Sequence, residues 1–319
     1  MRMPAEEVPV ELSAALNANA FGLLLLEGVN GIDVGVDAAD AYTLRLLVDD
    51  PDAPPAALPE SIGGFPYILV AGRPQLEQGG IPDEKTYGVP GADPVMGGIQ
   101  LGPAAIVGGE AHVGTLGCVF HDASGSPVAV SNAHVICGAV GDKIQQPAPH
   151  VDPAPSNERL GSLLQCLAPD TPSFIPGGLP SGFFDAALCS VDAARTAEVG
   201  RIADIGTVTA LSSPRIGSIV RKRGHRTGVS HGVVESTLGT YVARDRAGTP
   251  LWVLLGQVSI VRIPDLGLNP EGVWSRGGDS GSVVVNEGKE IVALHWGGDG
   301  LRGYASDFAP ITFTFGLGL

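Results

Sequence analysis

From about residue 101 to the end of the 319-residue chain, short apolar segments alternate with turns, and this pattern constrains the fold more than any other feature. Glycine and proline, 46 and 26 residues, are spread without a triplet period, which excludes a collagen-like chain and disfavours long helices. The sequence therefore predicts a mostly β protein, a sandwich or barrel rather than a doubly wound sheet. Strands are expected at 113–120, 126–130, 186–191, 217–220, 233–242, 251–261, 282–285 and 290–295.

The first part of the chain has a different pattern. Apolar residues at helical spacing predict a helix within residues 8–27. Strands are expected at 31–36, 42–48 and 67–70. We therefore divide the chain into a small N-terminal α/β unit (1–78), a connector rich in glycine and proline (79–100) and a β-rich domain (101–319). The unit could recruit substrate, mask a cleft or mediate assembly.

The net charge of −15 disfavours nucleic acid as a partner, because binding to phosphates needs a basic surface. It favours partners that present basic surfaces. The one basic cluster, residues 221–223 with Arg226, is short, and we expect a solvated strand edge or a local set of salt bridges there.

The sequence also bears on the compartment. No apolar run approaches the roughly 20 residues that span a bilayer, so no membrane association is expected. The acidic start does not resemble a secretion signal, and a cytoplasmic location is expected. The four cysteines (118, 137, 166 and 189) form no Cys-x-x-Cys pair, which predicts free thiols and no zinc site.

Three residues of the β-rich part have the chemistry of nucleophilic catalysis. His134 ends an apolar strand, Asp185 lies within an apolar run, and Ser280 lies in the glycine-rich loop 277–282. A serine hydroxyl attacks an acyl carbon when an imidazole takes its proton and a buried carboxylate orients that imidazole. The order His, Asp, Ser favours Asp185 as the orienting acid, with Asp192 as the alternative.

The glycines beside Ser280 have a role of their own. Without a Cβ atom, they allow backbone amides to turn inward, so the amides of Gly278 and Ser280 can both point at one developing oxyanion. Each residue alone is weak evidence, because such histidines, aspartates and glycine turns also occur in structural roles.

Three segments carry a resemblance to the trypsin-like serine proteases. They are Ser-Asn-Ala-His-Val at 131–135, Gly-Asp-Ser-Gly at 278–281 and Ile-Val-Ala-Leu-His-Trp-Gly at 291–297. The resemblance covers residues 100–315 and implies a chymotrypsin-like double β-barrel with the His-Asp-Ser triad between the barrels.

More narrowly, the chain resembles a bacterial branch related to the plant narrow-leaf trypsin-like proteases. The segments 97–99, 114–117 and 224–228 carry this likeness. A small N-terminal α/β unit is also typical of that branch.

The resemblance also implies a substrate cleft. Trp274 would lie at the base of the specificity pocket, which disfavours a Lys or Arg side chain and favours a small or apolar one. Trp296 and Gly297 would form the cleft wall. His295 stands where trypsins have a serine that bonds the catalytic aspartate, so it either replaces that contact or points elsewhere.

Residues 106–109, Ile-Val-Gly-Gly, are similar to the mature N-terminus of trypsins, whose free amine pairs with the aspartate before the nucleophile, here Asp279. The preceding residues 103–105 are not a basic cleavage site, and Ile106 lies close to His134 in sequence. We therefore expect the match to be a coincidence. Asp279 would then need another partner or would be solvated.

Together these features predict a serine endopeptidase that acts on protein or peptide substrates without a metal or organic cofactor. One alternative is a latent or inactive binding protein on a protease fold, and another is a hydrolase of small esters. Relatives of this kind often assemble through accessory segments, so a homo-oligomer is a further expectation.

Overall fold

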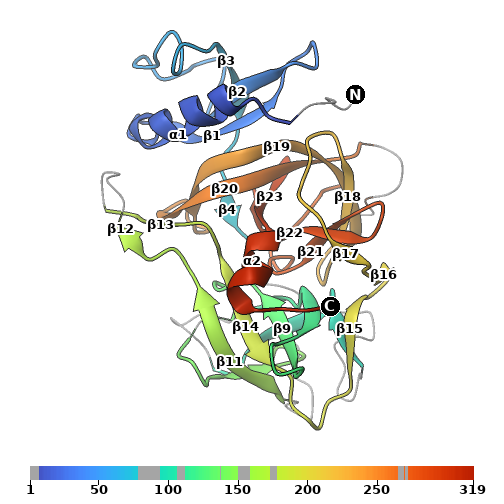
Figure 1. Ribbon diagram of the computed structural model, residues 1–319. Coiled ribbons are helices and arrows are strands. Elements are labelled where there is room, and N and C mark those ends of the chain that lie inside the picture. The colour runs from blue at the N-terminus through green and yellow to red at the C-terminus, as the bar shows by residue number, and fades with distance from the viewer. Residues whose placement is uncertain are drawn as a thin grey trace.

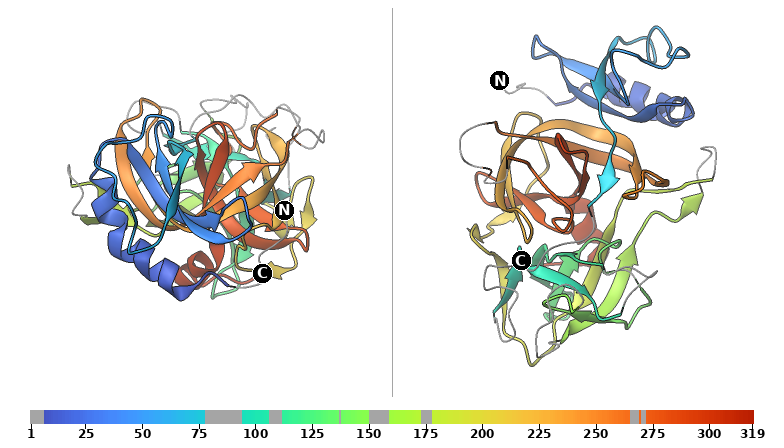
Figure 2. Two further views of the ribbon diagram at one scale, coloured as in Figure 1. Left: turned by 90° about the horizontal axis from the view of Figure 1, so that it is seen from above. Right: turned by 180° about the vertical axis from the view of Figure 1, so that it is seen from behind.

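The structure is a computed structural model, shown in Figures 1 and 2, and its described residues are 7–77, 94–105, 112–136, 138–149, 159–172, 178–264, 269 and 272–319. Strands dominate, as the sequence predicted, and the described residues contain two helices. Neither helix is long and apolar enough to cross a membrane. The fold is a chymotrypsin-like double β-barrel with an N-terminal unit attached to its second barrel.

The first barrel is a seven-stranded sheet that closes on itself. Its order is β7-β6-β10-β11-β14-β9-β8. Only Leu116 and Gly117 separate β7 from β8, and their amides donate to the carbonyls of Ile99 and Val130, so the two ends of the sheet are joined. The strands are β6 (Gln100–Pro103), β7 (Gly114–Thr115), β8 (Cys118–His121), β9 (Pro127–Ser131), β10 (Lys143–Gln145), β11 (Arg159–Leu167) and β14 (Ala186–Ser190).

The second barrel has the order β20-β23-β22-β21-β18-β19, and direct pairing of β19 with β20 closes the ring. Apolar side chains that alternate along these strands, among them Val220, Ile260 and Val284, fill its interior. The strands are β18 (Ile219–Gly224), β19 (Gly228–Arg244), β20 (Pro250–Arg262), β21 (Val283–Asn286), β22 (Glu290–Gly298) and β23 (Arg302–Asp307).

A shared core joins the barrels. Phe120 and Val128 of the first barrel meet Val283 and Leu294 of the second, together with Phe308 of the C-terminal helix α2 (Phe308–Phe315). The remaining strands are β5 (Val95–Gly97), β12 (Thr171–Pro172), β13 (Pro180–Gly182), β15 (Ala197–Ile202), β16 (Gly206–Thr207) and β17 (Ala210–Leu211).

The N-terminal unit continues the sheet of the second barrel. It consists of α1 (Val10–Leu24), β1 (Val29–Val36), β2 (Tyr42–Val48) and β3 (Tyr67–Ala71), which confirms the predicted helix and three strands. β1 pairs antiparallel with β19, and the order β19-β1-β2-β3 extends the sheet. α1 packs its buried leucines against this extension.

A buried ion pair fixes the unit to the barrel. Arg45 of β2 holds Asp33 at 2.7 Å and Glu235 of β19 at 3.1 Å. Tyr241 and Ser236 of β19 donate to the same Asp33 carboxylate. The unit is therefore joined to β19 by backbone pairing and by a buried polar network.

After β3 the chain enters the second barrel. Residues 75–76 form a short strand, β4 (Gln75–Leu76), that pairs with both β22 and β19. Figure 2 shows this cyan segment leaving the N-terminal unit toward the barrels. Of the predicted connector (79–100), residues 79–93 lie outside the described residues. Residues 95–97 form β5, and Gln100 begins β6.

Cys118 and Cys189 are buried free thiols, and Cys137 lies outside the described residues. Burial raises the pKa of Cys118 and of Cys189 to about 12, so both are unreactive thiols at neutral pH.

Candidate active site

His134 and Asp185 lie in direct contact in the first barrel. His134 follows the end of β9, and Asp185 immediately precedes β14, the strand paired with β9. One Asp185 oxygen accepts the His134 backbone amide at 3.0 Å, and the other contacts Nδ1 of the ring. Asp185 is fully buried. The carboxylate therefore fixes the orientation of the imidazole and favours a proton on Nδ1.

The predicted alternative, Asp192, has different contacts. It forms a half-exposed ion pair with Arg159 at 3.2 Å and accepts the Arg195 amide in a turn. Its contacts are those of a surface turn.

Ser280 lies in the loop between β20 and β21, in the second barrel. Its hydroxyl donates to the carbonyl oxygen of Trp296 at 2.8 Å. Gly278 has a φ of 111°, a conformation that favours glycine, and Thr115 of the first barrel donates to its carbonyl at 2.9 Å. The glycine loop is thus held between the barrels with one amide, that of Gly278, turned toward the segment that follows β4.

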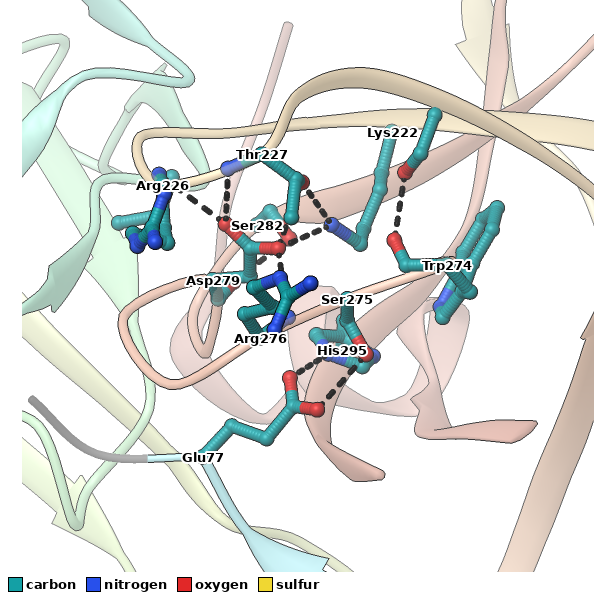
Figure 3. A network of polar contacts seen from close by, with 12 residues as sticks. Glu77, Lys222, Arg226, Thr227, Trp274, Ser275, Arg276, Asp279, Ser282 and His295 are labelled. Atoms are coloured by element: carbon teal, nitrogen blue, oxygen red, sulfur yellow. Dashed lines mark hydrogen bonds and ion pairs between the residues drawn. The ribbon is translucent and has the colours of Figure 1, made fainter. Parts of the chain in front are cut away.

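A buried ammonium group is the partner of Asp279. Nζ of Lys222 lies 2.9 Å from Asp279, and both side chains are completely buried. The Thr227 hydroxyl donates to the carboxylate at 2.6 Å, and the amides of Arg226 and Thr227 donate at 3.1 Å (Figure 3). Burial alone would raise the pKa of Asp279, but Lys222 and these hydrogen bonds lower it to about 2.

Lys222 is therefore the partner that Asp279 was expected to need, while the similarity of residues 106–109 to a mature N-terminus stays untested. Residues 106–109 lie outside the described residues, but the Asp279 carboxylate already has an internal cation. Lys222 and Arg223 are buried rather than on a solvated edge, so the basic run is the local salt-bridge set that the sequence allowed.

Residues 75–77 lie along β22 as an additional antiparallel strand. Leu76 pairs with Gly297 and Gln75 with Gly298. The Glu77 amide donates to the Trp296 carbonyl at 3.4 Å, the same oxygen that accepts the Ser280 hydroxyl. The Gly278 amide donates to the Glu77 carbonyl at 3.1 Å. A peptide carbonyl therefore occupies the predicted oxyanion position of Gly278.

The side chain of Glu77 enters a small polar pocket (Figure 3). The Ser275 hydroxyl donates to one carboxylate oxygen at 2.8 Å, and Nε2 of His295 lies 2.9 Å from the other. A Cβ atom at Gly298 would come within 2.4 Å of the first oxygen, so a side chain at this position would displace the Glu77 carboxylate from the pocket. Trp274 lies edge-on to the His295 ring.

His295 is neutral in this pocket at neutral pH. Burial lowers its pKa, although the hydrogen bond to Glu77 and the charge of that carboxylate oppose this shift. Its Nδ1 is buried without a hydrogen-bond partner among the described residues, while Nε2 faces the carboxylate. The arrangement fits the tautomer that carries its proton on Nε2 and donates to Glu77.

Leu76 and the predicted base, His134, share one apolar cavity. Its volume is about 360 Å³, and Ala133, Leu251 and Trp252 also line it. His134 is 4% exposed and Ser280 is 0% exposed. Residues 75–77, which we call the covering segment, therefore lie over the candidate site.

The predicted cleft residues contact residues 75–77 in different ways. Gly297 pairs with the segment, and His295 contacts Glu77 rather than Asp185. The Trp296 ring is fully buried, stacked on Tyr304, so only its backbone faces the segment. The side chain that contacts His295 beside Trp274 is the acidic one of Glu77, and the small or apolar substrate side chain expected there stays a prediction.

Sequence reasoning missed Glu77, Ser275 and Lys222. Glu77 contacts residues about 200 positions away, and no local pattern marks such a contact. For Lys222 a signal existed: Val220 and Lys222 are two apart on β18, and this spacing places both on the inner face.

Comparisons with known proteins yield distant structural similarity. No family model and no curated protein sequence matches the chain. The structure is similar to a Nocardiopsis protease (20% identity, TM-score 0.47, 70% of this chain and 96% of that chain). It is also similar to Thermobifida fusca protease A (20% identity, TM-score 0.45, 70% of this chain and 96% of that chain). A third similar structure is a glutamic acid specific serine protease described as using a histidine triad in substrate binding (15% identity, TM-score 0.48, 70% of this chain and 98% of that chain).

Proposed function

We propose that the protein is a serine endopeptidase in which Ser280 is the nucleophile and His134 the base. Asp185 orients His134, and the amides of Gly278 and Ser280 stabilise the oxyanion. The contact of Asp185 with Nδ1 supports this assignment, because it leaves Nε2 as the nitrogen that can take a proton.

The observation that carries the proposal is the hydrogen bond from the Gly278 amide to the Glu77 carbonyl. A peptide carbonyl lies on the amide that precedes the nucleophile by two residues, and the same peptide is paired with β22. Extended peptides commonly bind proteases by adding a strand to a sheet edge. This backbone pairing favours peptide substrates over small esters, which have no backbone to pair.

The reaction follows from these positions. Ser280 Oγ attacks the carbonyl carbon while His134 takes the hydroxyl proton, and the resulting oxyanion accepts hydrogen bonds from the loop amides. Collapse of this intermediate expels the amine, which receives the proton from His134. Water then hydrolyses the Ser280 ester, with His134 again acting as base and then as acid.

We include in this proposal the narrower resemblance to the bacterial branch related to the narrow-leaf proteases. Its three motifs meet around the nucleophile loop. Thr115 bonds the Gly278 carbonyl and the His225 amide, and a Cβ atom at Gly224 would collide with Asp279. Gly98 packs against the side chain of Arg223.

Hydrolysis of a mixed peptide library, followed by mass spectrometry, tests the function. We would use the Glu77→Ala variant, in which the covering segment loses its anchoring carboxylate. Cleavage is expected, and it should disappear when Ser280→Ala or His134→Ala is added. Asp192→Asn in the same background is the matched control and should cleave normally. No cleavage by Glu77→Ala would instead favour a latent or purely binding protein.

A further inference from the structure

We propose that the enzyme selects glutamate before the cut and that its own Glu77–Gln78 peptide bond is its first substrate. This inference rests on the proposed function, because Ser280 and His134 must be competent. It adds a substrate class and a self-processing site.

The backbone of residues 75–77 is seated as a substrate would be. Two of its residues pair antiparallel with Gly297 and Gly298, and Glu77 donates to the Trp296 carbonyl. A Cβ atom at Gly297 would come within 2.1 Å of the Gln75 carbonyl oxygen, so the close approach requires glycine. The Glu77 carbonyl then accepts a hydrogen bond from the amide of Gly278, in the loop that carries Ser280.

The pocket chemistry selects a carboxylate. Ser275 and His295 each present a donor to a different oxygen of Glu77. A carboxylate accepts at both oxygens, whereas the amide of glutamine has one acceptor oxygen, so either His295 loses its acceptor or the Ser275 hydroxyl must reverse and accept from the NH₂. Aspartate is one methylene shorter and would not reach both. We expect each replacement to slow cleavage by at least about tenfold, since at least one hydrogen bond to a charged oxygen would be lost.

The surroundings of the pocket favour acidic peptides as well. The open groove beside it, about 620 Å³ in volume, has among its charged lining residues Glu77 and Asp299 and three arginines, Arg226, Arg246 and Arg276. The net charge of −15 suggested basic partners, but the charge at this groove is locally positive. Local charge, rather than net charge, determines which peptide side chains the groove attracts.

The cut is a hydrolysis that consumes one water molecule. Ser280 Oγ bonds to the Glu77 carbonyl carbon, the bond from that carbon to the Gln78 nitrogen breaks, and His134 delivers the proton to the departing amine. Water then releases the Glu77 acid and regenerates the Ser280 hydroxyl. The products are residues 1–77 and residues 78–319.

The N-terminal product is expected to remain bound after the cut. β1 stays paired with β19, and Arg45 stays buried between Asp33 and Glu235. The new carboxyl end of Glu77 would stay at the Gly278 amide and inhibit the enzyme as a product. Activity toward other peptides would then require the segment to leave the groove.

Intact-mass spectrometry of the purified full chain over time tests the inference. Wild type should convert into the two fragments, which co-elute on native gel filtration and separate on denaturation. Ser280→Ala should stay whole, and Glu77→Gln and Glu77→Asp should convert at least about tenfold more slowly. The rate should not change on dilution, because the bond and the nucleophile belong to one molecule.

A second measurement separates this inference from the proposed function. A synthetic peptide of residues 71–80 is added to Glu77→Ala, with the same peptide carrying Gln at the Glu77 position as a control. Cleavage after Glu, preferred over Gln, supports the selectivity. A wild-type chain that stays whole while this peptide is cut overturns self-cleavage. Cleavage of library peptides with no preference for Glu overturns the selectivity but leaves the endopeptidase standing. No cleavage of any peptide overturns both.

Discussion

Replacing Lys222 with methionine should destabilise the protein and inactivate it. The Lys222 ammonium lies 2.9 Å from Asp279, and neither side chain is exposed. Methionine has a similar length but no charge, so it would leave the Asp279 carboxylate buried beside only neutral donors. Because Asp279 lies between Gly278 and Ser280, the loop that carries the proposed oxyanion donors should lose its position.

The magnitude follows from the pKa of Asp279, which falls from an ordinary 3.8 to about 2 although burial opposes this shift. A difference of nearly two units corresponds to roughly 2 kcal/mol of stability. The folded pKa is the lower one, so this contribution is present above about pH 4 and is lost as the pH falls toward 2. Without Lys222 the burial penalty remains, and we expect a loss of about 3–5 kcal/mol at neutral pH.

Urea unfolding at pH 7 measures this loss, in a Ser280→Ala background so that self-cleavage does not interfere. Lys143→Met, an exposed lysine on β10, is the matched control and should change stability by under about 0.5 kcal/mol. Asp279→Asn added to Lys222→Met should restore much of the stability, because no buried charge then lacks a partner. Lys222→Met within about 1 kcal/mol of its Ser280→Ala parent, together with normal cleavage by Lys222→Met when Ser280 is intact, would refute the reasoning.

Three further predictions concern the site and the N-terminal unit. Asp185→Asn should lower kcat for peptide cleavage by roughly 10⁴-fold in the Glu77→Ala background, whereas an equal loss in Asp192→Asn would contradict the choice of acid. Trp296→Phe should lower the free energy of unfolding in urea by about 1–2 kcal/mol, because it removes the hydrogen bond to Gln257. The variant should retain self-cleavage, since only the backbone of residue 296 faces the segment; loss of self-cleavage in a folded variant would show that the ring contributes. Arg45→Met should lose about 3–5 kcal/mol in urea unfolding and release the N-terminal fragment from cleaved protein on native gel filtration; continued co-elution would contradict the anchoring role of its ion pair.

Local sequence patterns predicted those helices and strands that hydrophobic spacing and turn residues mark directly. The helix and the first three strands are of this kind. Strands with mixed polarity, such as β11 and β23, were missed, because polar residues and glycine interrupt their apolar pattern. His134 and Asp185 were chosen for their chemistry, and the pairing of β9 with β14 brings them into contact.

The covering segment could not be predicted in the same way. Its strand partner, β22, lies more than 200 residues further along the chain, and residues 75–77 have no periodic pattern. The polar groups around the Glu77 side chain could not be predicted for a related reason. Trp274 was expected at the base of the specificity pocket, but the neighbouring Ser275 and the distant His295 supply the polar groups that the Glu77 side chain contacts.

Fluorophosphonate labelling of Ser280 tests most directly the claim that a competent serine nucleophile lies beneath the chain's own segment. Because Ser280 is fully buried under that segment, wild type should label slowly and Glu77→Ala at least about tenfold faster. Ser280→Ala and His134→Ala, each combined with Glu77→Ala, should not label. Equal labelling of wild type and Glu77→Ala would contradict the covering role of the segment, and no labelling of Glu77→Ala would contradict the catalytic assignment itself.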